Sequence, residues 1–150
     1  MTASLSSKGV EWQGTLYRKV LAPQHGDHDP SIFETVLSPQ SGPPRHIHHR
    51  EDETFYVVSG DVDFWLEGEI IKRGPGEALF APRGREHTFR VVGNAPARML
   101  TILTPGGFED FFAEMAQGNY SISRDMARII EIGARYNVSF TGPQLESGRQ

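Results

Sequence analysis

Short apolar runs separated by glycine, proline and polar turns fill the chain from Leu16 to Leu103. Runs of this length that are rich in β-branched and aromatic residues are typical of strands. The pattern predicts strands at Leu16–Leu21, Ser31–Leu37, Arg45–His49, Glu53–Ser59, Asp61–Glu67, Glu69–Lys72, Ala78–Ala81, His87–Val92 and Arg98–Thr104. Regular short strands with such turns favour an all-β fold, an antiparallel sandwich or barrel.

The pattern becomes helical after Thr104. A first helix is predicted because apolar residues recur at positions i, i+3, i+4 and i+7, namely at Phe108, Phe111, Phe112 and Met115, with Gly118 as the stop. A second helix is predicted from about Ser123, as N-cap, to Tyr136. Its apolar face is expected to hold Met126, Ile129, Ile130 and Gly133.

The ends of the chain carry weaker signals. Residues 1–10 are small and polar, so we expect a loose arm, and Val138–Phe140 is expected to be a short extended tail. The chain has 150 residues, which suits one domain. We therefore expect a single domain over residues 1–150, with a barrel at about 12–104 and a C-terminal helical flap at about 107–137.

Composition narrows the classes of function. Hydrophobic residues make up 37% and charged residues 23% of the chain, as in soluble globular proteins. The net charge of −4 gives no basic patch, which argues against nucleic-acid binding. No cysteine is present, so disulfides, thiolate ligands and a cysteine nucleophile are excluded. The N-terminus has no apolar signal-peptide core and no run suits a membrane span, so we expect a cytoplasmic protein without membrane contact.

The stretch from Gly42 to Gly60 carries the most informative chemistry. His46 and His48 are two residues apart, and side chains at that spacing share one face of a strand. Glu53 shares a strand face with Phe55, which favours burial. A buried carboxylate is costly unless it is paired or bound to a metal. Imidazole and carboxylate groups together are typical ligands of divalent transition metals.

A fourth candidate ligand comes from the segment Gly76–Val91. His87 begins a predicted strand whose inward face it shares with Phe89. The turn before it would bring His87 to the mouth of the barrel. We therefore expect His46, His48, Glu53 and His87 to converge on one metal, at about 2.0–2.2 Å from each ligand atom.

These residues resemble the first motif of the cupin superfamily. That motif has His-x-His, three or four residues, Glu, six residues and Gly; His46, His48, Glu53 and Gly60 match it. The Gly that leads this motif is represented by Gly42, which is separated from His46 by three residues instead of the usual five.

The second cupin motif is Gly, five residues, Pro-x-Gly, two residues, His, three residues and Asn. Gly76, Pro82, Gly84 and His87 match it, whereas the Asn position holds Val91. That Asn is not a metal ligand in the family, so the departure leaves the ligand set intact. The resemblance covers roughly residues 31–104, and the C-terminal segment more loosely resembles small bacterial quercetin dioxygenase-like cupins.

The resemblance implies a double-stranded β-helix, the jelly-roll cupin barrel, with C-terminal α-helices. It also implies one divalent metal ion, with Mn, Fe, Ni, Co, Zn and Cu all open, held by His46, His48, Glu53 and His87. By the same resemblance Glu53 would both bind the metal and accept a proton from the substrate. A homodimer and a small-molecule substrate are expected as partners.

Three functions stay open on this basis. The first is a metal-dependent dioxygenase that acts on a small aromatic or enolic substrate. The second is a non-catalytic module that binds a metal or a small molecule, and the third is a metal-dependent isomerase or lyase, which needs no oxygen. The barrel fold cannot separate them, because function depends on the cavity wall.

Residues near the motifs have two readings each. His49 should point outward, and His25 and His28, beside Asp27 and Asp29, are expected in a polar surface loop. Substrate cavity and barrel core are equally open for Phe33, Phe55, Phe80 and Phe89. A solvated rim is favoured over substrate steering for Arg45, Arg83 and Arg85. Phe108, Phe111 and Phe112 would either cap the cavity or only pack the helix on the barrel.

Overall fold

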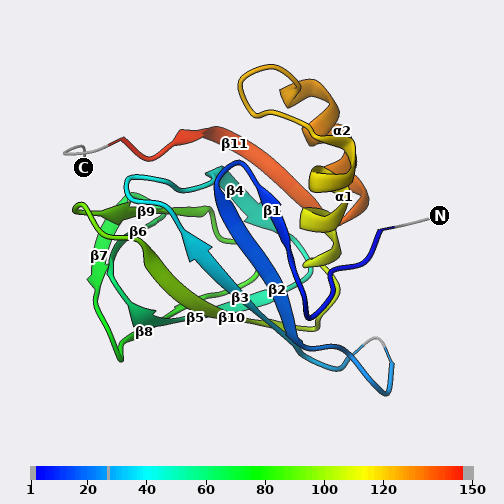
Figure 1. Cartoon of the computed structure of the whole chain (residues 1–150), viewed down its shortest axis with the longest axis horizontal. Coiled ribbons are helices and arrows are strands. Elements are labelled where there is room, and N and C mark those ends of the chain that lie inside the picture. Colours follow the sequence, from blue (N-terminus) through cyan, green and yellow to red (C-terminus); the bar gives the residue numbers. More distant parts are fainter. Residues whose placement is uncertain (1–2, 27, 147–150) are drawn as a thin grey trace.

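Two antiparallel sheets packed face to face, with two helices at one end, make up the computed structural model, which describes residues 3–26 and 28–146 (Figure 1). The six-stranded sheet, called sheet A, has the order β1-β2-β3-β10-β5-β8. The five-stranded sheet, called sheet B, has the order β11-β4-β9-β6-β7. This arrangement is the expected all-β double-stranded β-helix with C-terminal helices.

The elements follow the predicted order closely. The strands are β1 (Val10–Trp12), β2 (Thr15–Leu21), β3 (Ser31–Leu37), β4 (Pro44–His48), β5 (Asp52–Ser59), β6 (Asp61–Leu66), β7 (Glu69–Arg73), β8 (Ala78–Ala81), β9 (His87–Val92), β10 (Ala97–Thr104) and β11 (Val138–Gln144). The helices are α1 (Asp110–Gly118) and α2 (Met126–Arg135). Paired strands therefore extend beyond residues 12–104 at both ends.

A tight turn at Gly60 connects β5 to β6 and shows why glycine is needed there. Its φ is +84°, which is unfavourable for other residues. A Cβ at this position would also lie 2.7 Å from the Cα of Ala97. The predicted reversal at Gly60 and Asp61 is thus confirmed, and it fixes the register that points Phe55 and Val57 inward.

One apolar cluster, which we call the strand core, lies between the sheets, and all of its buried members come from strands. Its centre is Phe64, whose ring lies 5.2 Å from Phe55 and 5.7 Å from Phe89 between centroids. Its members are Leu37, Phe55, Val57, Val62, Phe64, Leu79, Ala81, Phe89, Val91, Ala97 and Met99. Alternating inward residues of facing sheets produce such a core.

A second apolar cluster, the helix-side core, joins the barrel to the two ends of the chain. Its buried members are Leu5, Trp12, Phe33, Leu103, Phe108, Phe111, Met115, Ile129, Ile132 and Val138. Leu5 is only 2% exposed, and its backbone N–H donates to Asp110. The prediction of a loose arm over residues 1–10 is therefore wrong at Leu5, because its side chain fills space beside α1.

A buried ionic contact fastens α1 to the barrel. Glu109, which is 0% exposed, accepts hydrogen bonds from the Ser31 hydroxyl at 2.7 Å and from the Gly107 N–H at 2.9 Å. Its other oxygen lies 3.2 Å from the Lys19 ammonium group on β2. The carboxylate therefore ties β2 and β3 to the start of α1.

The C-terminal segment differs from the prediction in three ways. Helix α2 begins at Met126 after Asp125, not after Ser123, because Asp125 accepts the Ser121 N–H and holds a turn before the helix. Ile130 is 47% exposed, and Ile132 takes its place in the core. The extended tail is longer than expected and pairs with β4 as strand β11.

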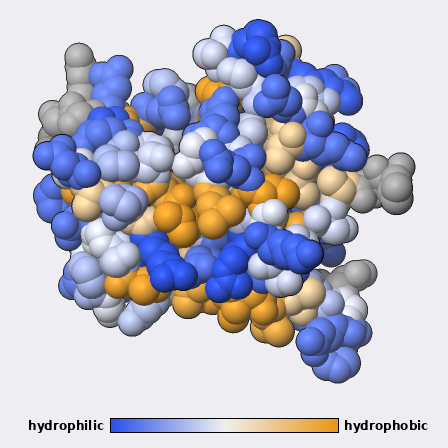
Figure 2. All heavy atoms as spheres, viewed as in Figure 1, coloured by the Kyte–Doolittle hydropathy of each residue, from blue (hydrophilic) through white to orange (hydrophobic). Residues whose placement is uncertain are grey.

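Apolar side chains also gather at the surface. Figure 2 shows them in a band across this face and along its lower edge, between hydrophilic residues. Large exposed apolar residues on sheet A include Tyr56, Val58 and Phe80, which lie on the neighbouring strands β5 and β8. Within the described ranges of the chain, none of the helices has the length and apolar character that a membrane span requires.

Candidate metal centre

Four buried side chains converge between the sheets as the motif spacing predicts. His46, His48, Glu53 and His87 each offer one ligand atom, and these atoms all lie within 4.8 Å of one another. The four residues are between 2% and 8% exposed. The structure thus brings together all the residues proposed as ligands, in a geometry compatible with a metal ion.

Strand geometry explains this convergence. His46 and His48 alternate with half-buried positions on β4, so both rings point inward. His46 pairs directly with His87 across β4 and β9 in sheet B, and directly opposed residues place their side chains next to each other. Glu53 comes from β5 in the opposite sheet. The cluster therefore spans the space between the sheets.

Backbone carbonyls fix the orientation of two imidazoles. The Nδ1 atom of His46 donates to the carbonyl oxygen of Pro44 at 2.7 Å, and Nδ1 of His87 lies 3.2 Å from the carbonyl oxygen of Arg85. A carbonyl can only accept, so the proton resides on Nδ1 in both rings. The Nε2 atoms then carry the lone pairs that a metal would bind, which is the usual arrangement of metal-binding histidines, and that of His87 lies beside the Glu53 carboxylate.

A carboxylate that sequence reasoning missed lies behind the third imidazole. Glu51 is 4% exposed, and its Oε1 atom lies 3.5 Å from Nδ1 of His48. A carboxylate behind a histidine raises the basicity of the ring and fixes its orientation toward a metal. In the sequence Glu51 belongs to the charged run Arg50–Glu53, which is typical of a solvated turn, so nothing in the pattern distinguished it.

Burial and mutual charge set the protonation of the cluster. Burial raises the pKa of Glu53, but the imidazoles of His48 and His87 outweigh it and lower the pKa to about 2. Burial, with repulsion from His87 and His48, lowers the pKa of His46 well below its ordinary value. Burial also lowers the pKa of His48, yet the carboxylates of Glu53 and Glu51 raise it overall.

The unsatisfied atoms of the cluster fit a metal ion. Both ring nitrogens of His48 are buried without a hydrogen-bond partner in the described structure, since Nε2 lies 3.4 Å from Glu53 Oε1 and Nδ1 lies 3.5 Å from Glu51. His87 Nε2 lies 3.0 Å from the same Glu53 oxygen. Unpartnered buried polar atoms are costly. A cation would satisfy these lone pairs and neutralise the carboxylate together.

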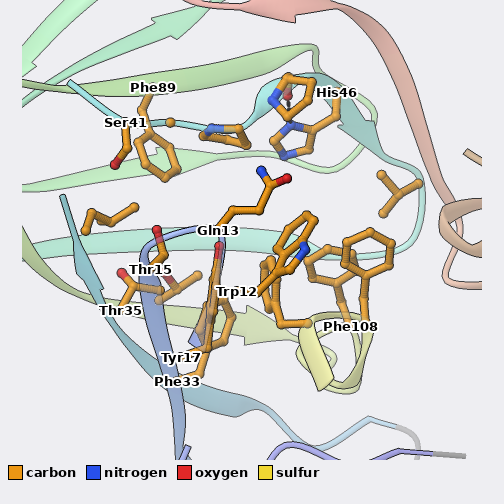
Figure 3. A pocket seen from close by; sticks show the side chains of 18 of the residues that line it. Trp12, Gln13, Thr15, Tyr17, Phe33, Thr35, Ser41, His46, Phe89 and Phe108 are labelled. Carbon is orange, nitrogen blue, oxygen red and sulfur yellow. Dashed lines mark hydrogen bonds between the residues drawn. The ribbon is translucent and has the colours of Figure 1, made fainter. Parts of the chain in front are cut away.

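A cavity of about 110 Å³ opens beside the cluster. His46, His48 and Glu53 form part of its wall, and aromatic rings form much of the rest. Figure 3 shows His46 on one side of this space, with Trp12, Tyr17 and Phe33 across from it and Phe108 at one end. The strands of both sheets and α1 therefore enclose a mostly apolar space at the ligand atoms.

The phenylalanines divide between the two readings that the sequence left open. Phe33, Phe55 and Phe89 are buried and line the cavity, so they belong both to the core and to the cavity wall. Phe80 is 53% exposed on the outer face of β8, so neither reading of Phe80 is correct. Phe108, Phe111 and Phe112 pack α1 on the barrel and also line the cavity.

The arginines near the motifs lie outside the cavity. Arg83 pairs with Asp52 at 3.2 Å, and Arg85 pairs with Glu67 at the surface. Arg45 lies over the ring of Trp65, with its guanidinium carbon 4.0 Å from the ring centroid. The cavity wall holds none of them. The solvated reading therefore fits the exposed Arg83 and Arg85, whereas Arg45 is half-buried with its Nε covered and fits neither reading.

The remaining histidines are exposed. His49 points outward, and its Nε2 lies 2.7 Å from the Ser139 hydroxyl on β11. His25 and His28 lie in the surface loop, where the His25 ring contacts Asp29 at 3.1 Å. Asp27, which was placed in the same loop, lies outside the described residues. None of these three histidines belongs to the buried cluster.

Comparison with known proteins adds a family to this geometry. The family model described as "Cupin domain" matches residues 33–103. The chain is also similar to a solved structure of the polyketide cyclase RemF from Streptomyces resistomycificus, with a TM-score of 0.55 and 26% identity. That similarity covers 71% of this chain and 81% of the other.

Two curated proteins are also similar to this chain. The quercetin 2,3-dioxygenase of Bacillus subtilis (strain 168) is 36% identical over 67 residues, which cover 45% of this chain and 20% of that protein. The tetracenomycin polyketide synthase protein TcmJ of Streptomyces glaucescens is 30% identical over 94 residues, which cover 62% of this chain and 63% of that protein. The chain thus spans less than two thirds of either relative.

Proposed function

The chain is a cupin, and from this premise we propose that it is a metal-dependent dioxygenase that acts on a small aromatic or enolic substrate. The observation that carries the proposal is the set of four buried ligand atoms beside an apolar cavity. His46, His48, Glu53 and His87 would hold one divalent transition metal ion. When bound, the ion would act as a Lewis acid and as a template for substrate and dioxygen.

Glu53 is the group placed to move a proton. Its Oε1 atom lies among the rings of His87 and His48, at 3.0 and 3.4 Å, which leaves Oε2 as the atom for a substrate hydroxyl proton. The low pKa of Glu53 keeps the carboxylate ionised before substrate binds. Loss of the substrate proton to Glu53 would increase electron density on an aromatic or enolic ring, which oxygen insertion requires.

The aromatic wall supplies orientation and excludes water. The ring of Phe108 meets the His48 ring edge-on at 4.5 Å between centroids, so it covers one side of a ligand. Phe55 lies 6.0 Å from the His87 ring in a similar geometry. A flat substrate between such rings would be held with one edge toward the ligand atoms.

Oxygen uptake with defined metals tests the proposal. The protein is loaded in turn with Mn, Fe, Co and Ni and offered flavonols and single-ring enediols, with and without oxygen. We expect substrate-dependent oxygen uptake with at least one metal. The absence of uptake across the panel, while metal is bound, would contradict the dioxygenase and favour a non-catalytic binding module.

The similarity to the polyketide cyclase RemF favours a second candidate, a metal-dependent ring closure or isomerisation at the same site. It would use the same ligands and the Glu53 carboxylate as the proton-transfer group. It differs in needing no oxygen. Substrate conversion that proceeds equally with oxygen excluded would support this candidate against the first.

The oligomeric state is a further part of the proposal. The exposed Tyr56, Val58 and Phe80 lie on the adjacent strands β5 and β8, and apolar sheet faces of this kind favour pairing of subunits. We expect a homodimer in the cytoplasm. Light scattering coupled to size-exclusion chromatography gives the mass directly, and a monomer would contradict this part.

A further inference from the structure

Three hydroxyl groups lie together on the wall that faces the histidines. Tyr17 on β2 pairs directly with Thr35 on β3, and Thr15 precedes Tyr17 on the same face of β2. The Thr15 side chain lies near enough to the Tyr17 hydroxyl to lower the pKa of the phenol, although burial raises it overall. All three line the cavity, and Figure 3 shows them on the side away from His46. We call this group the hydroxyl cluster.

One member of the hydroxyl cluster has no partner. Thr35 is 4% exposed, and its Oγ1 atom is buried without a hydrogen bond in the described part of the chain. Two side-chain amides of the cavity wall, by contrast, do have hydrogen-bond partners. Gln13 accepts the Ile122 N–H at 2.8 Å, and Gln144 donates to the Gly42 carbonyl at 2.6 Å. An unpartnered buried hydroxyl costs stability, so it indicates a missing ligand.

Tyr17 can serve as a donor over a wide pH range. Burial raises the pKa of its phenol above the ordinary value, so the group stays protonated. Its ring stacks on Phe112 at 3.9 Å between centroids, which fixes its position. The hydroxyl cluster therefore offers a phenol and an alcohol from paired positions on one wall of the cavity.

The rest of the cavity restricts the ligand further. Among the described residues, no lysine, arginine or aspartate lines it, so the end of a ligand far from the metal would be uncharged. Its volume of about 110 Å³ is below the range of about 300–1,000 Å³ for drug-sized ligands. An engineered cavity of about 150 Å³ is known to take benzene. The space is therefore on the scale of one ring and too small for three.

We propose that Thr35 and Tyr17 form a recognition site for a neutral oxygen atom of a single-ring substrate whose opposite edge faces the metal ligands. The substrate class is a small planar ring with oxygen atoms at both ends, such as an acylated enediol or catechol. The inference rests on the proposed metal-dependent function and makes it narrower, because it excludes three-ring flavonols. The sheets of a sandwich lie about 10 Å apart, a distance that one such ring can bridge.

Stability of the metal-free protein gives the first test. Thr35→Val keeps the shape of the side chain and removes the unpartnered hydroxyl, so we expect an equal or higher Tm. The matched control is Thr88→Val, because the Thr88 hydroxyl donates to the Pro43 carbonyl at 2.7 Å. The control should lower the Tm. A drop in Tm for Thr35→Val as large as that of the control would overturn the inference.

Calorimetric binding to the zinc-loaded protein without oxygen gives the second test. We expect Thr35→Val to weaken binding of 3,4-dihydroxyacetophenone about tenfold and of 4-ethylcatechol less than about twofold, because only the first probe has the distal oxygen. Thr35→Ser should restore most of the loss. Equal losses for both probes, or quercetin binding as tightly as either, would overturn the inference.

Zinc analysis before the titration separates this inference from the proposed function. If the wild-type protein holds no zinc, the metal proposal fails by itself. The same probes are then titrated into the metal-free protein, where the selective effect of Thr35→Val is still expected. Its absence there would also contradict the hydroxyl cluster as a recognition site.

Discussion

The strand core and the helix-side core bury similar residue types but have different roles in the structure. The strand core is built around Phe64, which is 1% exposed and does not line the cavity. The helix-side core packs against rings such as Phe112, and Phe112 does line the cavity. Leu37, Phe55, Phe89 and Met99 of the strand core also reach the cavity wall, so the cavity and the ligand cluster lie where the two cores meet.

The comparison separates residues whose contacts are set by strand pairing from residues whose contacts shape the cavity. Residues of the strand core come from one continuous stretch, and their partners are set by strand pairing. The buried residues of the helix-side core come from the N-terminal arm, three strands of sheet A, the two helices with the turn before α1, and β11. Contacts assembled from so many segments can vary in shape while the barrel stays the same.

The largest effect is expected from removing a ring of the strand core. Phe64→Ala should lower the free energy of unfolding by about 3–5 kcal/mol, because it leaves a sealed cavity. Phe112→Ala should cost less than about half of that, since its ring already borders a cavity. Urea unfolding measures both. Equal losses would show that the two cores do not differ.

The second-largest effect is expected from breaking the buried Lys19–Glu109 pair, which joins the helix-side core to the barrel. Lys19→Met leaves the buried Glu109 carboxylate without its cation, so we expect a loss of about 3 kcal/mol. The control is Lys72→Met, whose side chain is 76% exposed in its pair with Asp63 and should change stability by less than about 1 kcal/mol. A loss no greater than the control would mean that the buried pair does not fasten α1.

The two cores also differ in how accurately the sequence predicted their strands and helices. The strands of the strand core were predicted nearly to the residue, because alternating burial and glycine turns act locally. The three-residue β1 was missed, since it becomes a strand only by pairing with β2. The face of α2 was misplaced at Ile130, because tertiary packing on β11 decides which side is buried.

A smaller effect is expected at the carboxylate behind His48. Glu51→Gln keeps the size of the side chain and removes the charge, so metal affinity should fall about 10- to 100-fold. The exposed Glu69→Gln is the matched control and should leave affinity unchanged. Competition with a chelating dye measures both constants. An unchanged metal affinity in Glu51→Gln would show that the Glu51 carboxylate does not support metal binding through His48.

The ligand cluster itself was predictable, and its surroundings were not. Spacing of two on a strand was enough to place His46 and His48 on one face, and shared faces with phenylalanine brought Glu53 and His87 inward. Glu51 and Thr35 carry no such signal. Their roles depend on which side chain lies opposite them in the folded chain, and this depends on pairing between distant segments.

The central claim is that four side chains hold one metal ion at the boundary between the cores. Metal content of the wild-type protein and of His48→Ala and His87→Ala, each folded by circular dichroism, tests it most directly. We expect about one ion per chain in the wild type and less than about a tenth of that in either variant. Full metal content in both variants would contradict the account, as would a folded wild type that takes up none of Mn, Fe, Co, Ni, Cu or Zn.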